Sequence, residues 1–196
     1  MPWLIAGLGN PGPQYERTYH NLGFLAIDRL AERNGIRVTR TDSKALLGVG
    51  AISGKDVLLA KPQTFMNLSG ASLKPLVDKY SVEPRNVVVL YDDLDLPWTG
   101  LRVRPSGSSG GHHGMDDVIR RLGTQDFPRI RLGIDPGHPR NGIEFVLSPI
   151  KKAQIHELDE LLDHAAAATE SILAEGVEKA MTKFNRRAQG LTKEEE

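Results

Sequence analysis

The alternation of apolar and polar positions predicts strands and helices that follow one another along the chain. Continuous apolar runs at 3–8 and 87–91 are typical of buried strands, and the β-rich second run favours a central strand covered on both faces. Residues 22–34 are apolar at helical spacing and lie between Asn21, a good N-cap, and Gly35, a good helix stop. The same criteria predict strands at 38–41, 46–52, 57–60, 101–104 and 129–134, and helices at 69–80, 115–122, 152–174 and 177–187.

Strands that alternate with helices indicate a single α/β domain. Residues 53–56 have the composition of a hairpin turn, so we expect a twisted mixed β-sheet flanked by helices, with C-terminal helices after it. Pro75 is expected to bend or split the helix at 69–80. We expect the domain to span residues 1–187, and the polar tail 188–196 is predicted to be disordered.

Composition excludes several classes of site. The chain has 196 residues and a formal net charge of zero, so a polyanionic partner has to be held by local basic clusters. It contains no cysteine, which excludes a thiol nucleophile, a disulfide and a cysteine-zinc site. No apolar run approaches the roughly 20 residues that span a bilayer, and the N-terminus lacks the features of a signal peptide. A cytoplasmic protein is therefore expected.

A local basic cluster is present between residues 101 and 140, which hold seven arginines and four aspartates. Arg102 and Arg104 share one face of a predicted strand, as do Arg129 and Arg131. The planar guanidinium group suits phosphate, although charge alone is equally compatible with a solvated face that binds nothing.

His20 is the most informative single residue. It directly precedes the predicted helix at 22–34, whose positive N-terminal end disfavours a second positive charge and is expected to keep the imidazole neutral. A neutral imidazole in a pocket can accept a proton from water near pH 7.

Amide side chains follow two of the predicted strands. Asn10 lies in the glycine turn after the first strand, where it either presents its amide to a ligand or only shapes the turn. Asn67 lies beside Phe65 and Met66. Either its amide is placed beside an apolar wall to hold a polar group of a ligand, or Phe65 and Met66 pack in the core and Asn67 only caps the next helix.

Acidic and glycine-rich segments follow two further strands. Asp92, Asp93 and Asp95 come directly after the central strand, where ligands commonly bind in open α/β sheets. One of these acids could orient a histidine, or the three together could hold Mg²⁺. The glycine-rich segment 106–114 contains His112 and His113 and leads into a helix N-terminus, which attracts anions and carbonyl oxygens.

Two cofactor interpretations are weak. The run Gly7-Leu-Gly9-Asn10-Pro11-Gly12 matches the dinucleotide fingerprint. However, the helix that should begin within these glycines starts only near residue 22, and no second strand about 20 residues further on ends in the acid that would hold a ribose. The adjacent histidines at 112 and 113 point apart along the chain, which disfavours a zinc site. We therefore expect no cofactor and no metal. The chain also offers neither a thiol nor a Gly-x-Ser-x-Gly elbow as a nucleophile, which leaves water as the attacking group in any hydrolysis.

These segments, in this order, resemble bacterial peptidyl-tRNA hydrolase from residue 4 to about residue 187. The motifs that carry the resemblance are Gly7-Leu-Gly-Asn10-Pro-Gly12, Tyr15-x-x-Thr-x-His20-Asn21-x-Gly23, Thr64-Phe-Met-Asn67-x-Ser-Gly70, Asp92-x-Leu-Asp-Leu-Pro97, Gly110-Gly-His112-x-Gly114 and Arg129-Ile-Arg-Leu-Gly-Ile134. The resemblance implies a monomeric, metal-free esterase that cleaves the ester between a peptide and the 3′ ribose of tRNA.

The resemblance also implies residue roles. The catalytic positions would be His20 as the base, Asp92 as its orienting carboxylate, and the amides Asn10 and Asn67. The positions that would contact the substrate are Tyr15, Phe65, Met66, Asn67, His112 and His113. The arginines that would lie near the tRNA phosphates are Arg102, Arg104 and Arg131.

Two positions depart from the family pattern. Tyr19 stands where the family usually has arginine before the catalytic histidine, and His113 stands where it usually has asparagine. The esterase is the leading hypothesis. A noncatalytic RNA-binding protein of the same fold and a metal-dependent phosphoester hydrolase that uses Asp92, Asp93 and Asp95 are the alternatives.

Overall fold

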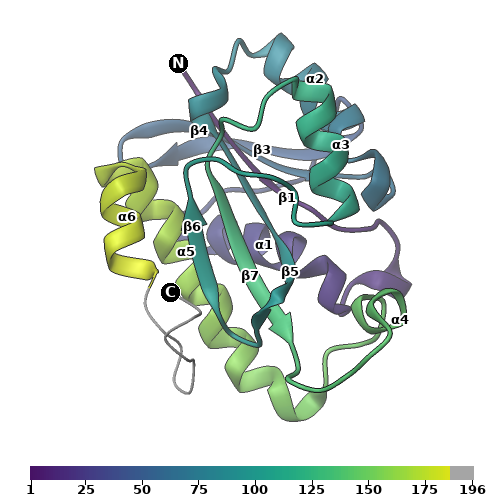
Figure 1. The fold of residues 1–196 in the computed structure, drawn as a ribbon. Helices are drawn as coiled ribbons and strands as arrows, with labels where there is room; N and C mark the ends of the chain where they lie inside the picture. Colours follow the sequence, from purple (N-terminus) through teal and green to yellow (C-terminus); the bar gives the residue numbers. More distant parts are fainter. Residues whose placement is uncertain (186–196) are drawn as a thin grey trace.

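The apolar run that ends at Tyr91 forms the first half of β5 (Val87–Pro97), which lies inside a seven-stranded sheet. The computed structural model describes residues 1–185. Its strand order is β2-β3-β4-β1-β5-β7-β6. β1 (Trp3–Gly7) pairs in parallel with β4 (Lys55–Pro62) and β5, and β5 pairs in parallel with β7 (Arg129–Asp135). The C-terminal ends of these four strands therefore meet at one edge of the sheet (Figure 1).

The remaining strands are antiparallel, which confirms the predicted mixed sheet. β3 (Ala45–Ile52) pairs with β4 and with β2 (Arg40–Asp42), and β6 (Leu101–Arg104) pairs with β7. The turn between β3 and β4 has φ angles of 52° at Ser53 and 76° at Gly54. Left-handed backbone at both central residues is typical of the tight hairpin turns that match strand twist.

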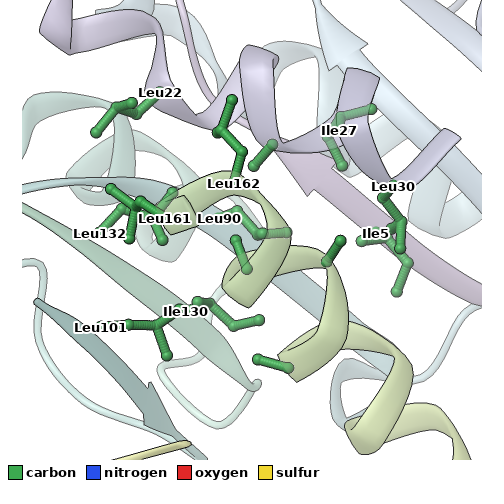
Figure 2. Packing of buried hydrophobic residues seen from close by; sticks show 14 of the residues in the cluster. Ile5, Leu22, Ile27, Leu30, Leu90, Leu101, Ile130, Leu132, Leu161 and Leu162 are labelled. Carbon is green, nitrogen blue, oxygen red and sulfur yellow. The ribbon is translucent and has the colours of Figure 1, made fainter. Parts of the chain in front are cut away.

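Helices cover both faces of the sheet because side chains alternate along each strand. Ile5 and Leu90 face α1 (Leu22–Asn34) and α5 (Ile155–Glu175), and Figure 2 shows their side chains packed against Leu30 and Leu162. Neighbouring positions such as Val89 face α2 (Gly70–Lys79) and α3 (His113–Leu122). The result is two hydrophobic cores separated by one sheet.

Glycines bring α1 unusually close to β1. A Cβ atom on Gly7 would lie 2.0 Å from the carbonyl oxygen of Gly23, and one on Gly23 would lie 2.4 Å from the backbone nitrogen of Leu8. Part of the glycine pattern that matches a dinucleotide fingerprint therefore serves helix–strand packing. This close approach places the start of α1 against the C-terminal end of β1.

Several element boundaries differ from the sequence predictions. Pro75 lies inside α2 without splitting it, because its missing N–H is tolerated on the exposed side of the helix. β5 continues through Asp92 and Asp93 to Pro97, beyond the apolar run. The helix at 152–174 begins as a 3₁₀ turn, η5 (Lys152–Gln154), and the last predicted helix is α6 (Val177–Phe184).

The sequence predictions missed the short elements. They are α4 (Gly142–Val146), η1 (Pro13–Tyr15), η2 (Tyr19–Asn21), η3 (Met66–Leu68) and η4 (Pro84–Asn86). The predicted disordered tail 188–196 lies outside the described residues. Within those residues, no helix combines the length and apolar character needed to cross a membrane.

Candidate active site

A cleft of about 380 Å³ lies at the edge of the sheet where the four parallel strands end. Each strand supplies a lining residue. Asn10 follows β1, Asn67 follows β4, Asp92 belongs to β5 itself, and Val146 lies on α4 after β7. His20 enters from η2, just before α1. The cleft thus occupies the position at which open α/β sheets commonly bind ligands.

Asp92 is the centre of a hydrogen-bonded group of three side chains at the base of the cleft. Its side chain is 2% exposed. The Nδ1–H of His20 donates to its Oδ2 at 2.8 Å, and the Nε2–H of His112 donates to its Oδ1 at 2.9 Å. Both oxygens of the carboxylate are therefore satisfied by imidazole rings.

The protonated nitrogens of these rings follow from their partners. An ionised carboxylate can only accept, so the ring nitrogens that face Asp92 carry the protons. His112 gives a second indication, because its Nδ1 accepts the backbone N–H of Met115 at 3.2 Å as the N-cap of α3. In His20 the proton on Nδ1 leaves Nε2 as the basic nitrogen.

The pKa values of the pair are displaced in opposite directions. Burial disfavours the charged form of His20, but the negative charge and the hydrogen bond of Asp92 outweigh it and raise the pKa of His20 above its usual value. Burial likewise disfavours the carboxylate of Asp92, yet His20 and His112 hold its pKa below the usual range. Asp92 therefore acts on His20 in the opposite direction to the N-terminal end of α1, which favours the neutral ring.

The residues of this group do not suit a metal ion in the arrangement observed. Among the described residues, His20, Asp92 and His112 are the one cluster whose ligand atoms come close enough to share an ion, all within 4.8 Å of one another. The ring nitrogens of His20 and His112 that face Asp92 are used in hydrogen bonds to its carboxylate, so a metal ion would have to displace both of these bonds. Asp93 and Asp95 do not join a metal-binding cluster within residues 1–185, so the three acids do not form the Mg²⁺ site considered above.

Asn21 and Asn10 join three loops of the cleft. The side chain of Asn21 makes no cap bond to α1. Its Oδ1 instead accepts the backbone N–H of Asn10 at 2.8 Å, and its Nδ2 donates to the carbonyl of Asn10 at 2.9 Å. Asn10 in turn uses its Oδ1 to accept the backbone N–H of Met66 at 2.7 Å. The start of α1, the loop after β1 and η3 are therefore held in one geometry.

Apolar side chains surround this polar base. Phe65 is 59% exposed and Ile143 on α4 is 72% exposed, and both line the cleft. Leu147 also lines the cleft. Met66 is buried in the wall, with its backbone tied to Asn10. The cleft combines a few placed polar groups with an apolar surround, as small-ligand sites commonly do.

Comparison with known proteins agrees with this architecture. Residues 4–193 match the family model described as peptidyl-tRNA hydrolase. The chain is 63% identical over 194 residues to a peptidyl-tRNA hydrolase of Solibacter usitatus (strain Ellin6076), which covers 98% of this chain and 99% of that protein. It is 46% identical over 185 residues to one of Bacillus subtilis (strain 168), covering 93% and 97%. The chain belongs to the peptidyl-tRNA hydrolase family.

A solved structure of the family shares the fold. The crystal structure of peptidyl-tRNA hydrolase from Acinetobacter baumannii matches with a TM-score of 0.86 at 35% sequence identity, covering 93% of this chain and 94% of that one. The predicted family and the predicted α/β fold with a mixed sheet are therefore confirmed.

The structure brings together most of the positions that the peptidyl-tRNA hydrolase resemblance singled out. The predicted site residues that line the cleft are Asn10, His20, Phe65, Met66, Asn67, Asp92, His112 and His113. Tyr15 lies on η1 and is not among the residues that line it. His112 contacts Asp92 rather than pointing freely into the cleft, and exposed His113 also borders a neighbouring pocket with Asp116 and Arg120.

The arginines lie on the α3 side of the sheet, with Arg131 on β7, one strand beyond Asp92, and Arg102 and Arg104 on the edge strand β6. Arg102 lies opposite Arg131, and Arg104 lies opposite Arg129, in the register of β6 and β7. Arg104 and Arg131 line a pocket of about 210 Å³ next to the cleft. Arg102 is 4% exposed and packs against the backbone of Asn185, so it is less accessible than the other two.

Sequence reasoning missed two contributors to the site. Asn21 was interpreted as a helix cap, and nothing local shows that its side chain reaches Asn10. α4 was overlooked, although Asn141 followed by Glu144 is an N-cap pattern that marks its start. In the structure the Asn141 side chain accepts the N–H groups of Ile143 and Glu144.

Proposed function

We propose that the chain hydrolyses the ester between the peptide and the 3′ ribose of peptidyl-tRNA, with His20 as the base that activates water. The observation that carries this proposal is the buried carboxylate of Asp92 on His20 Nδ1, which leaves Nε2 basic in the cleft. Membership of the peptidyl-tRNA hydrolase family supports the substrate. We infer that the protein acts in the cytoplasm as a monomer.

The proposed reaction needs no covalent intermediate with the protein. Nε2 of His20 removes a proton from water while the water oxygen bonds to the ester carbonyl carbon. The tetrahedral intermediate then loses the bond from that carbon to the 3′ oxygen of the ribose, and the imidazolium returns its proton to this oxygen. Asp92 stabilises the imidazolium during the step, because its negative charge lies 2.8 Å from the ring.

Amide groups are proposed to orient the substrate. The Oδ1 of Asn10 is occupied by Met66, so the Nδ2–H₂ group of Asn10 is the part that can donate to a substrate carbonyl. Asn67 is exposed at the cleft and is proposed to contact the substrate and the reacting water. His113 is proposed to take a similar polar position beside Asn67.

The tRNA is proposed to bind through the arginines next to the cleft. Arg104 and Arg131 line the adjacent pocket and are the accessible members of the predicted phosphate contacts. Burial, followed by the like charges of Arg102 and Arg131, lowers the pKa of Arg104. Accumulated positive charge of this kind is favourable for a phosphate group.

Replacement of His20 tests the proposal. With N-acetyl-phenylalanyl-tRNA as substrate, His20→Ala is expected to lower kcat by about 10² or more, the usual scale for a general base. His156→Ala is the control, because that histidine is 88% exposed on α5. Unchanged turnover in His20→Ala would reject the assignment of the base. If the unaltered protein bound tRNA in a salt-sensitive way but did not cleave the substrate, a noncatalytic RNA-binding protein would be favoured. If a chelator abolished the activity, a metal-dependent hydrolase would be favoured.

A further inference from the structure

Tyr19, which replaces the usual arginine of the family motif, is a buried aromatic residue. It is 2% exposed and lies on η2, immediately before His20. Its ring stacks on Phe145 of α4 with centroids 4.5 Å apart and an interplanar angle of 23°. The edge of Trp98 meets it with centroids 5.7 Å apart, and its hydroxyl donates to Oε1 of Gln154.

The stack connects the segment that carries His20 to one wall of the cleft. α4 presents Ile143 to the cleft and Phe145 to Tyr19. Backbone bonds reinforce the connection: the Tyr19 N–H donates to the carbonyl of Ser148 at 3.3 Å, and the Ile150 N–H donates to the carbonyl of Arg17 at 2.8 Å. The position of the wall relative to His20 is thus set by contacts within a few residues of Tyr19.

Beyond the contacts just described, α4 is held by its Asn141 cap, by the buried Val146 and by a hydrogen bond from Arg140 to the carbonyl of Leu94. It is a five-residue helix, shorter than the length at which isolated helices are stable in water. Ile143 is 72% exposed. The segment 137–141 that precedes the helix is also exposed, and its Gly137 has a left-handed backbone with a φ angle of 83°. Phe145 and the buried Val146 are the side chains that turn inward. Loss of the Tyr19–Phe145 stack should therefore displace the apolar wall more than the rest of the domain.

We propose that Tyr19 is a positioning residue that holds α4, through Phe145, as an apolar wall for the peptide part of the substrate. The inference rests on the proposed function, because it assumes that an acylated tRNA occupies the cleft. Tyr19 acts through the wall and not on the reacting atoms. Its effect is therefore on binding of apolar side chains of the peptide, and the chemistry at His20 is spared.

The test compares two substrates, N-acetyl-phenylalanyl-tRNA and N-acetyl-glycyl-tRNA. Tyr19→Leu and Phe145→Leu are each expected to raise KM for the phenylalanyl substrate by about 5-fold, from the strength of an aromatic pair. Their kcat is expected to stay within about 2-fold, and the double variant to be no worse than either single one, because one contact is lost in all three. The glycyl substrate is expected to show no such increase in KM.

Further variants keep the test informative if Tyr19→Leu fails to fold. Ile143→Ser changes a residue that is 72% exposed and is expected to raise KM for the phenylalanyl substrate alone. Val49→Ser is its control, because Val49 is 58% exposed and does not line the cleft. Tyr19→Phe keeps the stack and should retain the KM of the unaltered protein. Tyr80→Phe is the matched control, because it also removes a hydroxyl group that donates a hydrogen bond to another side chain.

Three outcomes would overturn the inference: equal changes for both substrates, losses confined to kcat, or additive effects of the Tyr19 and Phe145 substitutions. Each can be recognised only when the unaltered protein turns over both substrates. Failure of the proposed function would instead appear as no cleavage by the unaltered protein, so the two results are distinguishable.

Discussion

At the scale of single residues, the carboxylate of Asp92 determines the chemistry of His20. Local sequence predicts a histidine beside a helix N-terminus, whose dipole favours the neutral ring. The folded chain adds a buried negative charge 2.8 Å from Nδ1, and the pKa of His20 is raised as a result. The pH dependence of the reaction should therefore report on the contacts of Asp92.

Asp92→Asn is expected to move the acid limb of the kcat/KM profile to lower pH. The base must be unprotonated, so activity falls as pH decreases through the pKa of His20. Asp92 raises that pKa, and its removal lets burial lower it, so the variant should keep its own maximum rate to a lower pH. The maximum itself should fall by about 10² or more, because the imidazolium loses its partner. A pH profile from about 5 to 9 measures both effects; an acid limb that stays in place would contradict this account.

His112→Asn is expected to shift the same limb in the opposite direction. The Nε2–H of His112 donates to the same carboxylate that raises the pKa of His20. Without this donor, the negative charge of Asp92 should act more strongly on His20 and raise its pKa further. Asparagine remains a good N-cap, so α3 should still form. The same pH profile, with His156→Asn as control, checks the direction, and a shift to lower pH would show that His112 does not act as a donor to Asp92.

At the scale of elements, apolar periodicity predicted α1 with its observed bounds and identified the central strand. It failed where tertiary contacts stabilise a short piece of chain. α4 is short, so its periodicity carries little information, and it is held by the stack of Phe145 on Tyr19. The continuation of β5 through Asp92 also has no apolar signal, because pairing with β7 and not burial of apolar side chains extends the strand.

The contact between α1 and β1 leads to a stability prediction. Gly7→Ala is expected to lower the free energy of unfolding by at least about 2 kcal/mol, since overpacking of a close contact typically costs 1–3 kcal/mol. The added Cβ would lie 2.0 Å from a backbone oxygen, which cannot rotate away. Urea denaturation measures the change.

Gly35→Ala is the control for that substitution. Gly35 has a φ angle of 64° and no atom within 4 Å of an added Cβ, so only the left-handed backbone is penalised. A loss of about 1–2 kcal/mol is expected. If Gly7→Ala proved as stable as the unaltered protein, the close approach of α1 to β1 would not be a constraint on this fold.

At the scale of the whole molecule, charge is distributed locally. The chain has no net charge, yet four arginines face one another across β6 and β7 next to the cleft. This pairing of like charges is explained by the register of the two strands, which the sequence does not specify. It places Arg104 beside Arg131, which pairs with Asp93 at 2.6 Å, in the pocket where the tRNA is proposed to lie.

Arg104→Gln is expected to weaken tRNA binding and to reduce the slope of log Kd against log salt by about 1, the value for one lost phosphate contact. Arg85→Gln is the control, because Arg85 is strongly exposed, pairs with Glu83 and does not line the pocket that contains Arg104 and Arg131. Fluorescence titration at several salt concentrations measures the slope. An unchanged slope for Arg104→Gln would remove Arg104 from the proposed tRNA contacts.

The sequence by itself determined the α/β class, most helices and strands and the family, because these depend on periodicity and on motifs that are local in the chain. It also identified His20 and Asp92 as candidates. Only the tertiary structure decided that Asn21 holds Asn10, that His112 contacts Asp92 and that Tyr19 supports α4. These contacts join residues that are from 11 to 126 positions apart, and parallel strands that end at one edge of a sheet are what bring them together.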